Sequence, residues 1–248
     1  MQHGSRGIPH MLYATKEVTK GLVALFVLLL PLLFLGSGQL TTSPAPTAVK
    51  KITLPTHANL PWLDTQRFQN HIQTRLPHYQ GHFENAAKEF DIPWTLLASQ
   101  GYQESRWNRN AISPTGVRGI MMLTQNTASS LGVENRLDPI QSIWGGAQYF
   151  THLKNQIPQF IQNPDRIWIA LAAYNVGMGH IKDAQALAKR LHKNPHTWND
   201  LKTVLPLLAQ KKYYKTLPHG YARGNEPVRY VTRIQAYWDL LEHYMSEV

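Results

Sequence analysis

The sequence predicts a mainly α-helical domain with a cleft, preceded by an N-terminal signal or anchor helix and a flexible linker. Two observations predict the helical class. Apolar residues recur at helical spacing along most of the chain after residue 64, and no stretch alternates strongly enough to be a strand. We therefore divide the chain into residues 1–38 as signal or anchor, 39–63 as linker, and 64–248 as the folded domain.

The N-terminal segment has the pattern of an export signal. Lys16 and Lys20 precede residues 21–35, which carry no charge, and small residues follow at positions 36–38. The apolar stretch is shorter than the roughly 20 residues of a comfortable membrane span. Export is expected, with the segment either cleaved or kept as a membrane anchor.

The linker is rich in proline, threonine and serine. Pro44, Pro46, Pro55 and Pro61 fall within residues 39–63. Such a composition gives an extended chain that packs poorly. We expect a tether between the membrane and the domain.

The first predicted helices lead up to Glu104. Asp64 can cap a helix that runs toward Leu76 and is limited by Pro77. The next helix has an apolar stripe, formed by Phe83, Ala86, Ala87 and Phe90. Asp91 and Pro93 then open a third helix.

Capping residues mark the helices in the second half of the domain. Thr124 can cap a helix over 125–131, with Gly132 as its stop, and Asp138 with Pro139 starts the next. Inward-facing residues of that helix are expected to be Ile143, Trp144, Ala147 and Phe150.

Three more helices complete the prediction. One begins at Asp165 and another spans about 180–192, and the last begins at Asn225. The first carries an apolar side of Ile167, Trp168, Leu171, Ala172 and Tyr174. The last keeps helical period through Val228, Val231, Ile234, Trp238, Leu241 and Met245.

Glu104 is the candidate catalytic residue. One apolar face of the predicted third helix is formed by Trp94, Leu97, Ala98 and Gly101, which follow helical spacing. Glu104 lies on the same face, three residues after Gly101. The carboxyl is therefore expected on the buried side of a helix end. Burial disfavours the charged form and raises the pKa, which suits a general acid near neutral pH.

A single glutamate near a helix end is more often solvated than catalytic. The stretch behind it favours the catalytic interpretation. Gly116 and Gly119 lie in a nearly uncharged segment, and glycines allow the backbone to approach closely. Such a loop can form the wall of a cleft facing the helix end.

Composition excludes several classes of protein. Hydrophobic residues make up 43% and charged residues 16%, which is typical of a globular chain. Cysteine is absent, so disulfides, thiolate metal sites and cysteine nucleophiles are excluded. The net charge of +10 suits an anionic polymer, but the basic residues are scattered and nucleic acid is not expected as a partner. No cofactor is expected, and no metal site either, because His71, His78 and His82 do not give the set of His-x3-His plus a carboxylate that metal sites favour.

Four motifs, taken together and in order, resemble those of the lytic transglycosylase family, whose SLT domain is similar to goose-type lysozyme. The motifs are Gln103-Glu104-Ser105, Ser113-Pro114-Thr115-Gly116 with Gly119-Ile120-Met121, Ala172-Ala173-Tyr174-Asn175-Val176-Gly177, and Glu226 followed by Arg229-Tyr230-Val231. The likeness covers residues 64–248 and is strongest to the catalytic domain of the F-type, membrane-bound members. Those members also carry a solute-binding-like domain, in whose place only the tether is expected here.

The resemblance implies a lysozyme-like fold and cleavage of peptidoglycan between N-acetylmuramic acid (MurNAc) and N-acetylglucosamine (GlcNAc), with 1,6-anhydro products, at the periplasmic face of a bacterial envelope. It implies that Glu104 is the sole acid and base. It also implies that substrate contacts come from Ser113, Met121, Met122, Tyr174, Asn175 and Tyr230. Met122 stands where many relatives have glutamine. The implied partner is the glycan strand, with the membrane as a second partner if the segment 1–38 is uncleaved.

Two other functions stay open at this point, beside a specialised cutter that opens a gap in the wall for a secretion apparatus and would need a partner protein. A lysozyme-type hydrolase would need a second carboxyl. Glu134 and Asp138 are the nearest candidates in sequence, and Asp138 before Pro139 fits a helix cap better. A wall-binding module without turnover is the second alternative, and the intact Glu104 disfavours it.

Overall fold

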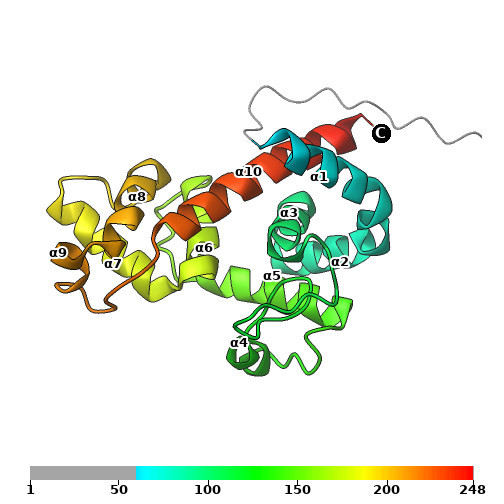
Figure 1. The fold of residues 1–248 in the computed structure, drawn as a ribbon, viewed down its shortest axis with the longest axis horizontal. Helices are drawn as coiled ribbons and strands as arrows, with labels where there is room; N and C mark the ends of the chain where they lie inside the picture. The colour runs from blue at the N-terminus through cyan, green and yellow to red at the C-terminus, as the bar shows by residue number, and fades with distance from the viewer. Residues whose placement is uncertain (1–59, 248) are drawn as a thin grey trace, which may run out of the picture. The chain divides into compact units, whose positions relative to one another are not determined.

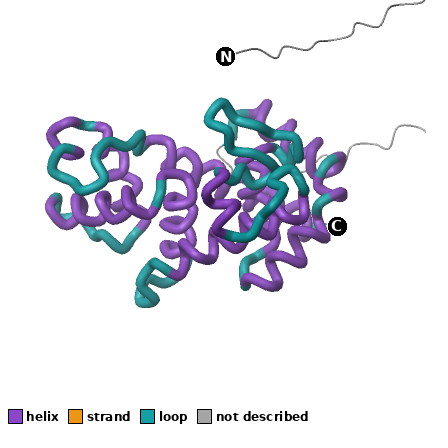
Figure 2. The backbone as a smooth tube through the Cα atoms, turned by 90° about the horizontal axis from the view of Figure 1, so that it is seen from below, coloured by secondary structure: helices purple, strands orange, loops and turns teal. Residues whose placement is uncertain are grey.

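The structure, a computed structural model, describes residues 60–247. All of their regular elements are helices, and the predicted helical class is confirmed (Figure 2). Isolated bridges join Arg118 to Ile112 and to Leu123, and these are the only strand-like pairs in the described part. The predicted signal or anchor helix and most of the predicted linker lie outside the described residues.

The helices follow one another with short connections, except between α3 and α4. Their bounds are α1 Trp62–Thr74, η1 Leu76–His78, α2 Gln80–Phe90, α3 Trp94–Ser105, α4 Gln125–Ser130, α5 Pro139–Asn155, α6 Asp165–Val176, α7 Met178–Arg190, α8 Trp198–Val204, η2 Leu205–Ala209, α9 Lys211–Tyr214 and α10 Asn225–Ser246. Within residues 60–247, no helix has the length and apolar character needed to cross a membrane.

Helix α10 connects the two ends of the described domain (Figure 1). It packs against α3 and α6, and α5 in turn packs against α2 and α6. Its inward face buries Val231, Ile234 and Leu241 completely, as the helical period predicted. The last turn of α3 and the end of α6 therefore both lie against the same long helix.

An aromatic cluster fixes the end of α3. Phe68, Tyr102, Trp107 and Tyr237 are buried, with neighbouring ring centroids 4.5 to 5.6 Å apart. The Trp107 indole N–H also donates to the carbonyl of Ala98 at 2.8 Å. Edge-to-face packing of this kind adds stability beyond buried area. It ties α1, α3 and α10 together beside Glu104.

Two sequence predictions about helix residues are wrong. Helix α1 begins at Trp62 after Pro61, so Asp64 lies in the first turn instead of capping the helix. There it forms ion pairs with Arg67 and Arg233. Trp144, predicted to face inward, is 39% exposed and contacts Phe90 by its ring edge.

The loop between α3 and α4 is held by side chains of the following segment. Arg136 donates to the carbonyls of Gly116 and Leu123, both at 2.9 Å, and the Ser142 hydroxyl accepts the Met121 N–H at 3.1 Å. Because these bonds replace regular secondary structure, the loop keeps a defined conformation.

We expect Gly119→Ala to destabilise the domain by about 3 kcal/mol or more. Gly119 has φ +81°, and an added Cβ would lie 1.8 Å from the carbonyl oxygen of Arg136. Gly116→Ala is the matched control, because Gly116 has the same φ but no atom within 4 Å of the added Cβ. It should cost about 1 kcal/mol. Denaturant unfolding measures both, and equal losses would contradict the close approach at Gly119.

Candidate active site

Glu104 lies in the last turn of α3, and its side chain is partly exposed. The hydroxyl of Tyr230, on α10, donates to Glu104 Oε1 at 2.5 Å. The Gln100 amide donates in turn to the Tyr230 oxygen at 3.3 Å. Leu97, Ala98 and Gly101 on the same helix are buried, so the predicted buried side of α3 is confirmed.

Burial raises the pKa of Glu104 from its ordinary value of 4.5 to about 8. The hydrogen bond from Tyr230 acts in the opposite direction, because it favours the charged carboxylate. The position at a helix C-terminus also disfavours negative charge. The carboxyl is therefore mostly protonated at neutral pH.

Tyr174 completes the surroundings of the carboxyl from α6. Its hydroxyl donates to the carbonyl of Met121 at 2.9 Å, and its ring lies 5.1 Å from that of Tyr149. Burial and the nearby Glu104 charge hold the pKa of Tyr174 well above its usual range. The structure thus brings Glu104, Tyr174 and Tyr230 together from three helices.

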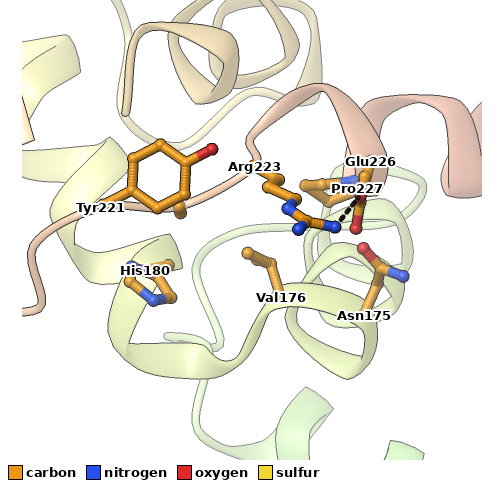
Figure 3. A pocket seen from close by; sticks show the side chains of 8 residues that line it. Asn175, Val176, His180, Tyr221, Arg223, Glu226 and Pro227 are labelled. Carbon is orange, nitrogen blue, oxygen red and sulfur yellow. Dashed lines mark hydrogen bonds and ion pairs between the residues drawn. The ribbon is translucent and has the colours of Figure 1, made fainter. Parts of the chain in front are cut away.

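Two adjoining pockets form a cleft along α10. One, of about 330 Å³, is lined by Gln103, Asn175, Glu226, Arg229, Tyr230 and Arg233. The second, of about 270 Å³, shares Asn175 and Glu226 with the first and extends to His180 and Tyr221 (Figure 3). In Figure 3, Asn175 on α6 faces Glu226 on α10, and Glu226 forms an ion pair with Arg223 at 3.5 Å.

The remaining predicted site residues lie in or beside the loop. Ser113 uses its hydroxyl within the loop, accepting the Val117 N–H at 3.2 Å and bonding Thr115 at 2.9 Å. Met122 is partly exposed, with a left-handed backbone at φ 48°. Met121 is fully buried, so its side chain does not face the cleft as predicted. Its carbonyl serves instead as the acceptor for Tyr174.

Sequence reasoning missed several residues around the carboxyl. Gln100 stands four residues before Glu104, a spacing that places both on one helix face. Glu226 was named in the fourth motif but not as a site residue, although it precedes Tyr230 by the same interval on α10, which could have marked it as a cleft residue. Arg233 follows Tyr230 by three residues and so shares its helix face. Tyr149 gave no comparable signal, because it reaches the site only through tertiary packing. No group of three side chains suited to hold a metal occurs within residues 60–247.

Comparisons with known proteins agree with these motifs. Residues 81–197 match the transglycosylase SLT domain family. The chain is 54% identical over 182 residues to membrane-bound lytic murein transglycosylase F of Pseudomonas putida, covering 73% of this chain and 38% of that protein. It is 55% identical over 175 residues to membrane-bound lytic murein transglycosylase F 1 of Alkalilimnicola ehrlichii, covering 71% and 35%. The chain thus spans little more than a third of the length of these relatives.

A solved structure shares the fold. An inactive mutant of lytic transglycosylase Slt from Pseudomonas aeruginosa superposes with a TM-score of 0.52 and 18% identity, over 71% of this chain and 25% of that one. This likeness concerns the fold alone. The sequence matches confirm the resemblance indicated by the four motifs: residues 81–197 of this chain are similar to the transglycosylase SLT domain family.

Proposed function

We propose that this chain is a lytic transglycosylase that cleaves the β-1,4 bond between MurNAc and GlcNAc in peptidoglycan and leaves 1,6-anhydro-MurNAc ends. Glu104 is its single acid and base. The observation that carries the proposal is the hydrogen bond between Tyr230 and the Glu104 carboxyl at the edge of a polar cleft, where burial raises the pKa of that carboxyl. The similarity to lytic murein transglycosylases F supports it.

In the first half of the reaction Glu104 acts as an acid. Because Oε1 accepts the Tyr230 hydroxyl, the acidic proton belongs on Oε2. Oε2 donates this proton to the O4 leaving oxygen as the C1–O4 bond breaks. The N-acetyl oxygen of the MurNAc unit attacks C1 of that same MurNAc and takes the place of a protein nucleophile.

In the second half Glu104 acts as a base. Its carboxylate, stabilised by the hydroxyl of Tyr230, removes the proton from the C6 hydroxyl. O6 then bonds to C1 and displaces the N-acetyl oxygen, which closes the anhydro ring. Glu104 ends protonated, as it began, and no water is consumed. Neither half requires a metal or a cofactor.

The hydrolase alternative needs a second carboxyl in the cleft. Asp138 is occupied as the cap of α5, where it accepts the Gln141 N–H at 2.9 Å. Glu134 is exposed and does not line either cleft pocket. Glu226 does line both pockets, so it is the candidate for a second carboxyl in a hydrolase.

Digestion of purified sacculi in ¹⁸O-labelled water distinguishes the reactions. The transglycosylase leaves anhydro ends that contain no ¹⁸O, and mass spectrometry of the released fragments reads this directly. Labelled reducing ends would instead establish a hydrolase. Binding to sacculi without any released fragment would establish a wall-binding module.

The other residues receive the roles that the family resemblance implies. Tyr174, Asn175 and Tyr230 contact the sugars, while Ser113 and Met122 contribute from the loop. Met121 acts through its carbonyl, which holds Tyr174. We further propose residues 64–248 as the catalytic domain, tethered by 39–63 to an exported segment 1–38. The enzyme would then act at the periplasmic face of the envelope, anchored or released.

We expect Tyr230→Phe to move the alkaline limb of kcat/KM above pH 8. The lost hydrogen bond favours the carboxylate, so its removal raises the pKa of Glu104 further. Activity should fall about tenfold or more, because the carboxylate of the second half loses its donor. Tyr174→Phe is the control, because the Tyr174 hydroxyl donates to the Met121 carbonyl and not to Glu104. The alkaline limb of kcat/KM in this variant should stay near pH 8. A limb that moves to lower pH in Tyr230→Phe would contradict this role.

A further inference from the structure

A third pocket lies beyond the end of α3, and the proposed reaction does not use it. It has a volume of about 410 Å³ and is lined by Arg67, His71, Arg75, Ser105, Arg106 and Asn108. Three of these six side chains are guanidinium groups, and none is a carboxylate. Such a lining is typical of a site for an anion.

The arginines converge from two helices. Arg67 and Arg75 come from α1 and its C-terminal cap, and Arg106 is the C-terminal cap of α3. Arg75 donates to the backbone carbonyl of Arg106 at 2.9 Å, which joins the two helix ends at the pocket. This bond fixes the pocket wall independently of any ligand.

The positive charge in this pocket is only partly compensated. Asp64 lies 3.3 Å from Arg67, but the same carboxylate also binds Arg233 at 3.0 Å. His71 adds no charge at neutral pH. Burial, followed by the charges of Arg75, Arg106 and Arg67, lowers its pKa to about 4, and its Nδ1 is bonded to the Tyr102 hydroxyl at 3.1 Å.

The pocket adjoins the Glu104 cleft. Arg233 lines that cleft and donates to Gln103, while its ion pair with Asp64 leads directly to Arg67. Ser105, in the pocket wall, is the residue that follows Glu104. The cleft and this arginine-lined pocket therefore share the last turn of α3, with Gln103 lining the cleft and Ser105 lining the arginine pocket.

We propose that the arginine pocket binds a free carboxylate of the peptide stems carried by the peptidoglycan strand in the cleft. This inference rests on the proposed function. Guanidinium groups bind carboxylates through two parallel hydrogen bonds, and Asn108 and Ser105 supply further polar groups. The sugar hydroxyls carry no charge, so the peptide branch is the part of the strand that matches this pocket.

The test compares cleavage of strands with intact peptide stems and strands from which an amidase has removed the stems. For the full chain, we expect kcat/KM to be about tenfold higher on peptide-bearing strands, as KM is lower. In Arg67→Gln/Arg106→Gln this ratio should fall to about one. Arg67→Lys/Arg106→Lys keeps the charge but not the paired hydrogen-bond geometry, and its ratio should lie between that of the wild type and that of Arg67→Gln/Arg106→Gln.

A matched control removes the same charge elsewhere. Lys189→Gln/Lys211→Gln changes two exposed lysines that line none of these pockets, and its ratio should stay near ten. An unchanged ratio in Arg67→Gln/Arg106→Gln, with thermal unfolding like that of the wild type, would overturn the proposal. The proposal would also be overturned if the ratio fell to the same extent in the control Lys189→Gln/Lys211→Gln. Absence of anhydro products from both substrates would instead refute the proposed function.

Discussion

Glu104→Gln should reduce the release of anhydro fragments from sacculi by about 10³-fold or more. Glutamine is nearly the same size but can neither donate nor accept the proton, and general acid–base catalysis contributes roughly 10² to 10⁴ in each step. The same carboxyl serves both steps in this mechanism. Fragment release followed by chromatography measures the loss.

Two controls show whether the loss belongs to Glu104. Glu134→Gln changes an exposed glutamate outside the cleft and should retain wild-type turnover. Glu226→Gln changes the other carboxyl of the cleft and should weaken, but not abolish, cleavage. More than a tenth of wild-type activity in Glu104→Gln would remove Glu104 from its role. Complete loss in Glu226→Gln would favour a two-carboxyl reaction.

Glu104→Gln should also make the domain more stable at alkaline pH. The folded state holds the Glu104 proton up to about pH 8, whereas the unfolded state loses it near pH 4.5. Between these values the folded state binds more protons, so its stability falls as pH rises. The difference corresponds to at most roughly 5 kcal/mol. Since solvent reaches part of the side chain, we expect a gain of about 2 kcal/mol for Glu104→Gln at pH 9.

Denaturant unfolding at several pH values measures this gain. It should be fully present above pH 8, decline as pH falls, and vanish below pH 4.5, where both states are protonated. Glu89→Gln, at an exposed position of α2, should differ from the wild type by a small, constant amount. A gain for Glu104→Gln that did not change with pH would mean that the carboxyl titrates normally.

The sequence predicted those parts of the fold that depend on local pattern. Thr124 and Asp138 cap α4 and α5 as expected, because a side-chain oxygen ahead of an apolar period is a local signal. Asp64 misled the prediction, since its spacing fits a cap while Pro61 starts α1 earlier. The short helices α8 and α9 were not predicted, because four to seven residues give too little periodicity.

The candidate site was predictable only in part. Glu104 followed from the apolar face of α3, which lies within one helix. Its bond with Tyr230 joins residues 126 positions apart and arises from the packing of α10 on α3. Met121 shows that a motif does not reveal whether a side chain is buried. A motif can place a residue in the loop, but only the packed structure shows that Gly146 lies against its side chain and that it is buried.

A direct titration of the Glu104 carboxyl is the sharpest test of its role as the acid and base. The ¹³C resonance of this side chain can be assigned by comparison with Glu104→Gln. It can then be followed from about pH 3 to about pH 10, a range that includes both the ordinary and the raised pKa of the carboxyl. If Glu104 is the acid of the first half of the reaction, the midpoint lies at about 8. A midpoint near 4.5 would show a carboxyl that is ionised at neutral pH, and it could not start the reaction as the acid.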